Sequence, residues 1–179
     1  MENRIGKLIN QVKRRSISLV APLNNEAYMK ALNKYMIKAG FNINGDVCYV
    51  HPTVYFDGSD YSLITLENGV SISRDVMFLT HDFSINTVYK GLDLKNSDEI
   101  ERKYKKDRCR VLRPISVGSN TFIGAKAFIC PGAKIGKNCL IGAGSVVRGT
   151  IPDNSVASGN PCVVLCKTSE WLEKKHFEC

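Results

Sequence analysis

Residues 117–147 read VGSNTFIGAKAFICPGAKIGKNCLIGAGSVV, and an aliphatic residue recurs in this stretch at every sixth position without an error. Glycine often follows that residue directly, and the residue four places after it is small in most repeats. The aliphatic positions are Val117, Ile123, Ile129, Ile135, Ile141 and Val147. A helix has a period of about 3.6 residues and a simple strand has a period of about two, so neither explains this pattern.

A three-sided parallel β-helix does explain a period of six. Each hexad supplies one short strand and one corner, and three hexads close one coil. Successive coils then stack at the usual strand spacing of about 4.8 Å. The aliphatic residue fills the triangular interior, and the small residue fits near the corner. The sequence therefore predicts a mainly β fold built as a solenoid.

The same register continues upstream less perfectly, at Ile43, Tyr49 and Tyr55 and again at Ile64, Val70 and Val76. The step from Tyr55 to Ile64 is longer than one hexad, which predicts an extra loop over residues 57–62. A much longer interruption runs from Asp82 to Pro114. Loops of this length inside a compact domain are usually functional.

Helical patterns flank the repeat. Apolar side chains recur at helical spacing within residues 5–12 and 28–39, with Asn24 or Asn25 as a cap and Gly40 as a stop. We expect these helices to cover the open edge of the first coil. After the repeat, the pattern predicts a last strand over 163–166 and a short helix over 170–177. The predicted organisation is a helical cap over 1–40, a β-helix over 41–167 with an inserted loop over 82–114, and a C-terminal helix over 168–179.

Composition narrows the class of protein. The chain has 179 residues, enough for one domain, and its 25 Lys and Arg against 17 Asp and Glu give a net charge of +8. That charge favours an anionic partner, but the basic residues are scattered, which argues against a nucleic-acid surface. No apolar run approaches the length of a membrane span, and no cleavage signature follows the N-terminus. We therefore expect a cytoplasmic protein whose seven cysteines are reduced thiols.

The hexads occur together with FLTHD (78–82), GAGSVV (142–147) and IPDNSVASGNP (151–161). In this combination the chain resembles the hexapeptide-repeat acyltransferases, and especially the maltose, galactoside and polysaccharide O-acetyltransferases. The resemblance implies a left-handed β-helix and a homotrimer with active sites between neighbouring subunits. It also implies acetyl-CoA as the co-substrate, a hydroxyl group of a sugar or sugar-derived acceptor, and no metal.

The resemblance assigns the catalytic histidine to His81, which ends FLTH just before the long interruption. Free imidazole titrates near about 6.5, so a histidine can take a hydroxyl proton at cellular pH and return it to the leaving thiolate. Asp57 lies in the extra loop of the first coil, where relatives often have a carboxylate that binds acceptor hydroxyls. Turn chemistry explains its Asp-Gly pair equally well. Asp82 is either a second substrate-binding carboxylate, a group that orients His81, or a solvated loop residue.

The resemblance assigns coenzyme binding to Ala125 and Ala143, which are three hexads apart and therefore one coil apart on the same corner. Small side chains there leave the backbone accessible to the pantetheine amides. Arg148 and Gly149 match the next coenzyme-binding pair of the family. Relatives carry arginines after the exit motif that this chain lacks, and Lys167 and Arg148 are the two candidates to supply the charge for the coenzyme phosphates.

Several alternatives stay open. Xenobiotic acetyltransferases of the streptogramin type share these motifs, and serine acetyltransferases share part of them but usually have a longer helical N-terminal domain. A non-enzymatic solenoid that binds a partner along one face is also compatible with the repeat. A zinc hydratase on this fold needs three histidine ligands, but no histidine lies between His81 and His176. A cysteine nucleophile is disfavoured, because Cys109, Cys130 and Cys139 have no histidine close in sequence.

Overall fold

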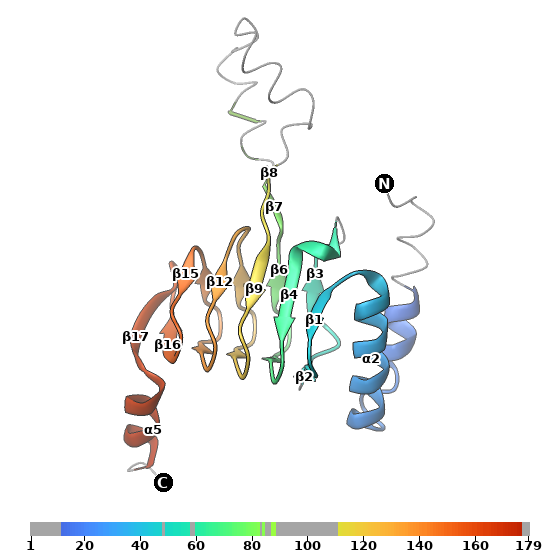
Figure 1. Ribbon diagram of the computed structural model, residues 1–179, viewed down its shortest axis with the longest axis horizontal. Helices are drawn as coiled ribbons and strands as arrows, with labels where there is room; N and C mark the ends of the chain where they lie inside the picture. Colours follow the sequence, from blue (N-terminus) through green and yellow to red (C-terminus); the bar gives the residue numbers. More distant parts are fainter. Residues whose placement is uncertain are drawn as a thin grey trace, which may run out of the picture.

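The computed structural model describes residues 12–47, 49–57, 60–82, 84, 87–88 and 111–176. In this part the chain winds through short parallel strands that stack into three sheets, and the sheets form the faces of a prism (Figure 1). The mainly β class and the three-sided parallel β-helix predicted from the period of six are therefore confirmed.

The three faces can be named from their strands. Face A consists of β1 (Asn42–Asn44), β4 (Ile64–Glu67), β9 (Ile115–Val117), β12 (Lys134–Ile135) and β15 (Thr150–Ile151). Face B consists of β2 (Tyr49–Val50), β5 (Ser71–Ile72), β10 (Phe122–Ile123), β13 (Leu140–Ile141), β16 (Ser155–Ser158) and the antiparallel edge strand β17 (Val163–Lys167). Face C consists of β3 (Tyr55–Phe56), β6 (Met77–Phe78), β11 (Phe128–Ile129) and β14 (Val146–Val147). Because the chain passes from A to B to C in each coil, the prism has three edges, which we call A/B, B/C and C/A.

Strand pairing gives the length of each coil. Phe128 pairs with Val146 on face C, which is the predicted step of three hexads. Across the interruption, Met77 pairs with Phe128. The separation of these two residues equals one regular coil plus the predicted interruption from Asp82 to Pro114, so the β-helix resumes in register after the insertion.

The interior of the prism is apolar. All six aliphatic positions predicted between residues 117 and 147 are buried there, each at most 3% exposed. The predicted register upstream is correct for Ile43, which lies in register with Leu66 and through it with Val117, but Leu66 takes the place predicted for Ile64. The residues in register with Ile123 and Ile129 are Val50, Ile72, Phe56 and Phe78. They replace the predicted Tyr49, Val70, Tyr55 and Val76, respectively. Ile64, Val70 and Val76 are nevertheless buried, so apolar residues one or two positions apart made both phases fit a period of six.

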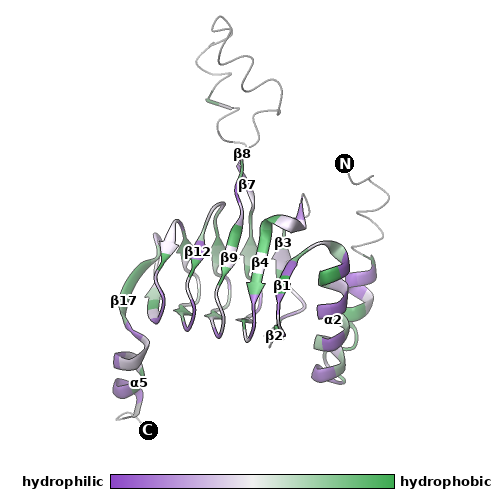
Figure 2. Cartoon of the chain, viewed as in Figure 1, coloured by the Kyte–Doolittle hydropathy of each residue, from purple (hydrophilic) through white to green (hydrophobic). Residues whose placement is uncertain are grey.

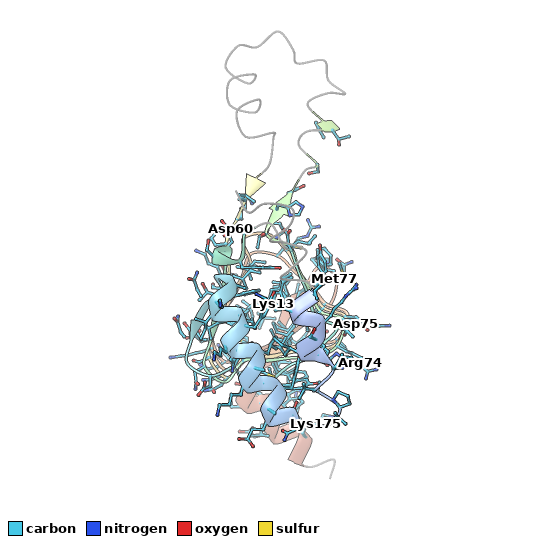
Figure 3. All side chains as sticks on the ribbon, turned by 90° about the vertical axis from the view of Figure 1, so that its right-hand side faces the viewer. Lys13, Asp60, Arg74, Asp75, Met77 and Lys175 are labelled. Atoms are coloured by element: carbon cyan, nitrogen blue, oxygen red, sulfur yellow. The ribbon has the colours of Figure 1, made fainter. Side chains whose placement is uncertain are left out.

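Two helical segments cover the first coil, and Figure 3 shows both in front of the coils when the prism is viewed from that end. Helix α2 (Asn25–Ala39) begins after Asn24, whose side chain accepts a hydrogen bond from the backbone N–H of Ala27 at 2.9 Å. It ends at Gly40, which has a φ of +99° that suits glycine. Residues 12–18 form the other helical segment, while most of the helix predicted over 5–12 lies outside the described residues.

The cap also satisfies the backbone of the first coil. In the second coil, the carbonyl of Val76 accepts a hydrogen bond from Tyr55 N of the preceding coil at 2.8 Å. The equivalent carbonyl in the first coil, that of Val54, has no preceding coil, and the Arg14 guanidinium donates to it instead. In the same way the Tyr28 hydroxyl donates to the carbonyl of Val50 at 2.7 Å. Side chains thus protect an edge that would otherwise expose unpaired strand carbonyls.

At the other end, β17 folds back on β16, and helix α5 (Thr168–His176) follows. The sequence predicts a strand and then a helix here; the last residue of the predicted helix, Phe177, lies outside the described residues. In Figure 2 β17 is coloured hydrophobic, whereas α5 is largely hydrophilic. The remaining elements lie at edge C/A: η1 (Tyr61–Leu63) in the extra loop, and β7 (His81–Asp82) and β8 (Val111–Leu112) at the two ends of the insertion. Within the described part of the chain, no helix is long and apolar enough to span a bilayer.

Candidate active site

The candidate site lies at edge C/A, where the coils depart most from the regular repeat. The extra loop of the first coil and the insertion of the second both leave the β-helix there. At the base of the insertion, His81 pairs with Leu112 in a short antiparallel ladder, and Arg113 N donates to the carbonyl of Thr80 at 2.9 Å. The backbone on both sides of His81 is therefore held by hydrogen bonds, and its side chain is 23% exposed.

His81 is paired with a carboxylate from the preceding coil. The Nδ1 atom of His81 is hydrogen-bonded to Oδ2 of Asp57, which directly follows β3. Thr80 donates to the same oxygen twice, from its backbone N–H at 3.2 Å and from its hydroxyl at 3.0 Å. The Asp57 side chain is only 5% exposed, so this carboxylate is bound by three donors in a buried position.

The surroundings of Asp57 favour its charged form. Burial by itself raises the pKa of Asp57, but the hydrogen bonds from His81 and Thr80, together with the charge of His81, more than offset this effect. The net result is a pKa below the ordinary value of 3.8, so Asp57 is an anion at neutral pH. A carboxylate that holds Nδ1 as a donor leaves the lone pair of a neutral imidazole on Nε2, the arrangement of a general base.

Sequence reasoning missed this contact, because it expected Asp57 to bind acceptor hydroxyls and gave Asp82 a possible role in orienting His81. In the structure Asp82 instead accepts a hydrogen bond from Ser84 N at 2.8 Å and is exposed. The signal that could have revealed the contact is the length of the first coil. Tyr55 pairs with Met77, so Asp57 lies one coil before residue 79, next to His81 in space.

A cleft of about 680 Å³ opens beside His81. Asp82, Arg148 and Gly149, all predicted as site residues, line it together with Arg113, which the sequence did not single out. The hydrogen bonds from Ser84 lower the pKa of Asp82, and the two arginines lower it further. The cleft therefore combines a histidine with two guanidinium groups, a suitable environment for an anionic reactant.

Cys130 also lines the cleft but does not have the features of a nucleophile. Burial raises the pKa of its thiol, although Arg148 beside it acts in the opposite direction. A raised pKa disfavours the thiolate that nucleophilic catalysis requires. Nor do the described residues contain a group of three or more histidine, cysteine or acidic side chains that could hold a metal ion.

The other predicted coenzyme-binding residues lie away from this cleft. Ala125 and Ala143 sit one coil apart on edge B/C, where the carbonyl of Ala125 accepts a hydrogen bond from Gly144 N at 2.8 Å. Lys167 is exposed at the end of β17 on face B. A single chain thus brings His81, Asp57, Asp82, Arg148 and Gly149 to one edge of the prism and leaves Ala125 and Ala143 on another.

Comparison with known proteins supports this architecture. The family model "Bacterial transferase hexapeptide (six repeats)" matches residues 114–149. Over 126 residues, 70% of this chain, the sequence is 33% identical to "Putative acetyltransferase YJL218W" of Saccharomyces cerevisiae, and it spans 59% of that protein's length. It is 29% identical over 153 residues to the galactoside O-acetyltransferase of Escherichia coli, covering 79% of this chain and 70% of the relative.

Solved structures show the same fold. A galactoside acetyltransferase in complex with coenzyme A matches 90% of this chain and 82% of its own, with a TM-score of 0.51 and 23% identity. The fold is the left-handed β-helix that the resemblance implies. The chain thus carries the bacterial transferase hexapeptide repeat over residues 114–149, and its relatives in sequence and its neighbours in fold are acetyltransferases.

Proposed function

We propose that this protein transfers an acetyl group from acetyl-CoA to a hydroxyl group of a sugar or sugar-derived acceptor, with His81 as the general base. The observation that carries the proposal is the hydrogen bond between the buried carboxylate of Asp57 and Nδ1 of His81, a residue that lines the cleft. The galactoside O-acetyltransferase relative and the coenzyme A complex of a galactoside acetyltransferase support the choice of reaction and donor.

The reaction needs one base and no covalent intermediate on the protein. The acceptor hydroxyl oxygen attacks the thioester carbonyl carbon of acetyl-CoA while His81 Nε2 takes the hydroxyl proton. The C–S bond then breaks, and the imidazolium returns that proton to the departing thiolate. The products are an acetyl ester and the free thiol of coenzyme A. Asp57 acts as a positioning residue, because its negative charge stabilises the imidazolium that forms in the transition state.

The proposal includes a binding site for the donor that is shared between two chains. Arg148 and Gly149 would contact the coenzyme from edge C/A of one chain, and Ala125 and Ala143 would contact it from edge B/C of the next. These two edges bound face C on opposite sides. In a cyclic trimer whose face C is turned toward the threefold axis, edge C/A of each subunit meets edge B/C of its neighbour. Lys167 remains a candidate for the coenzyme phosphates.

The outward side chains of the faces support this arrangement. On face C they form an apolar ladder in strand register, Tyr55, Met77, Phe128 and Val146. The corresponding ladder on face A is polar, Thr65, Ser116, Lys134 and Thr150. Tyr55 is 49% exposed and Met77 is 38% exposed in the single chain, which is unfavourable for a free surface and suits an interface. We therefore infer a homotrimer that closes around face C.

A cytoplasmic location belongs to the same proposal. The described cysteines, Cys130, Cys139, Cys162 and Cys166, are all free thiols. Free thiols persist in reducing compartments, where disulfides are rare.

The test is release of the coenzyme A thiol from acetyl-CoA in the presence of single acceptors. The panel contains monosaccharides, disaccharides, nucleotide-linked sugars, serine and streptogramin-like alcohols, and mass spectrometry identifies the acetylated product. We expect turnover with a saccharide and an O-acetyl ester as the product. Turnover with serine or a streptogramin alone would move the assignment to those transferases, and failure to bind acetyl-CoA at all would refute the proposal.

A further inference from the structure

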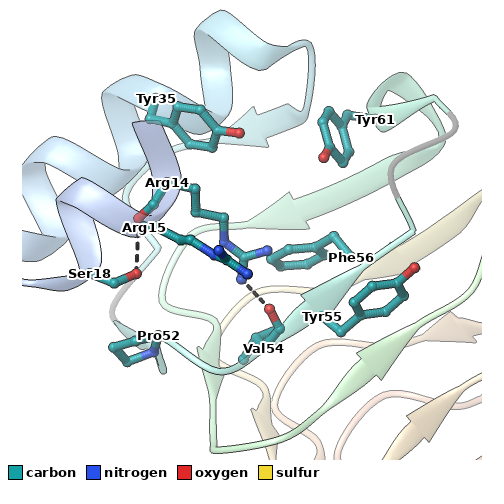
Figure 4. Close-up of a pocket in the computed structure, with 9 residues that line it drawn as sticks. All are labelled: Arg14, Arg15, Ser18, Tyr35, Pro52, Val54, Tyr55, Phe56 and Tyr61. Carbon is teal, nitrogen blue, oxygen red and sulfur yellow. Dashed lines mark hydrogen bonds between the residues drawn. The ribbon is translucent and has the colours of Figure 1, made fainter. Parts of the chain in front are cut away.

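A second cleft, of about 310 Å³, lies at the N-terminal end of the β-helix, between the helical segment 12–18, α2 and the first coil (Figure 4). Its polar lining comes chiefly from Arg14 and Arg15, and its walls are the aromatic side chains of Tyr35, Tyr55 and Tyr61. It shares no lining residue with the cleft beside His81. The acetyl-transfer proposal does not use it.

Arg14 is the unusual feature of this cleft. Its guanidinium lies over the ring of Phe56, 5.1 Å from the ring centroid, and donates to the carbonyl of Val54. Capping such a carbonyl requires one hydrogen-bond donor and no charge, because the neutral Tyr28 hydroxyl does the same at the carbonyl of Val50. Edge protection therefore explains the hydrogen bond but not the choice of a permanently charged side chain with five donors.

The charge of Arg14 has no counter-ion in the described part of the chain. No carboxylate there lies within ion-pair distance of its guanidinium. Burial lowers the pKa of Arg14, and the groups that oppose this effect are tyrosines, Tyr28, Tyr35 and Tyr61, rather than carboxylates. Burying an unpaired cation is costly, and an anion bound in the adjacent cleft would offset that cost.

We propose that this cleft binds a small molecule that carries a carboxylate or phosphate group on a ring-shaped body, such as a sugar acid or a sugar phosphate. The oxyanion contacts the guanidinium groups of Arg14 and Arg15, which suit planar, bidentate recognition of such groups. The ring of the ligand packs against the aromatic walls formed by Tyr35 and Tyr61. The volume lies at the lower end of the range for small-molecule sites, which restricts the ligand to about one ring.

The experiment measures binding by titration calorimetry and by the rise in melting temperature that a bound ligand produces. The probes are inorganic phosphate, glucuronate, glucose 6-phosphate and glucose, each compared with chloride at matched ionic strength. We expect the three oxyanions to bind and glucose not to bind. A preference between glucuronate and glucose 6-phosphate identifies carboxylate or phosphate as the group recognised.

Three variants locate the site. Arg15→Gln, at an exposed position, should weaken oxyanion binding at least about tenfold, because it removes a charge-assisted hydrogen bond. Arg14→Lys keeps the charge and the cap but loses the bidentate fork, and it should weaken binding as well. Arg113→Gln, in the cleft beside His81, is the matched control and should bind as the wild type does. Oxyanion binding that survives in both Arg14→Lys and Arg15→Gln, or no binding of any oxyanion to the wild type, would overturn the proposal.

Discussion

Replacement of Asp57 by asparagine should lower kcat while leaving the fold and the binding of acetyl-CoA intact. Both donors of Thr80 point at Oδ2, at 3.2 and 3.0 Å, so the amide will place its oxygen there rather than its NH2 group. The oxygen can still accept the hydrogen bond from His81 Nδ1, and the ring should keep its tautomer. What the variant loses is the negative charge beside His81.

The size of the effect follows from that charge. A carboxylate in hydrogen-bond contact with an imidazolium near the protein surface interacts with it by up to about 4 kcal/mol. The neutral amide retains about 1 kcal/mol of hydrogen-bond energy. A net loss of about 3 kcal/mol in the transition state corresponds to a fall in kcat of about 10²-fold.

The assay is thiol release at saturating acetyl-CoA with the acceptor identified from the panel. Asp153→Asn is the matched control, because Asp153 is an exposed carboxylate at edge A/B whose ion pair with Lys137 spans 3.9 Å. We expect kcat of that variant to match the wild type. If Asp57→Asn kept kcat within about threefold of the wild type, the charge of Asp57 would have no part in catalysis.

Three further predictions concern stability and assembly. Because the folded-state pKa of Asp57 is lowered, the stability that its ionised form contributes is complete well above pH 3.8 and is lost as the pH falls through the lowered value. In urea melts, the advantage of the wild type over Asp57→Asn should therefore shrink in acid, and an advantage independent of pH would contradict this. Gly124→Ala places a Cβ 2.6 Å from a backbone nitrogen of the next coil, and it should cost about 1–3 kcal/mol of unfolding free energy. In Gly144→Ala the added Cβ enters open space, and the only cost is the strain of an alanine at a φ of +69°. Thermal melts should therefore show a smaller loss of stability in Gly144→Ala than in Gly124→Ala, and the reverse order would refute the packing argument. Met77→Asp on face C should dissociate the trimer in analytical ultracentrifugation, whereas Thr65→Asp on face A should not, and an intact Met77→Asp trimer would exclude face C as the interface.

The periodic part of the fold could be predicted because one rule repeats there. Each hexad between residues 117 and 147 places an aliphatic residue inside, and the strand pairing follows from the step of three hexads. The same rule misplaced the first two coils, where Tyr55 and Phe56 are adjacent apolar residues and either could point inward. Burial chose Phe56, which is 5% exposed, because the prism interior accepts the ring without a hydroxyl to satisfy.

The candidate site was predictable in its parts but not in its assembly. The motif around His81 singled out the histidine, yet its partner Asp57 comes from a coil of irregular length that a strict period cannot align. Arg113 enters the cleft only because the two ends of the insertion pair with each other, a contact between residues far apart in the sequence. From the sequence, Ala125 and Ala143 are expected to bind the same acetyl-CoA as Arg148 and Gly149. Only the proposed meeting of edge B/C of one chain with edge C/A of the next explains how all four could contact one coenzyme molecule.

The most direct test of the central claim compares acetyl transfer by His81→Ala and His176→Ala with the wild type. His176 is the control histidine, because it is the last residue of α5, at the opposite end of the β-helix from the first coil. The account predicts that kcat falls at least about 10²-fold in His81→Ala, with unchanged affinity for acetyl-CoA, and stays at the wild-type level in His176→Ala. Wild-type turnover by His81→Ala would contradict the role of His81 as the base.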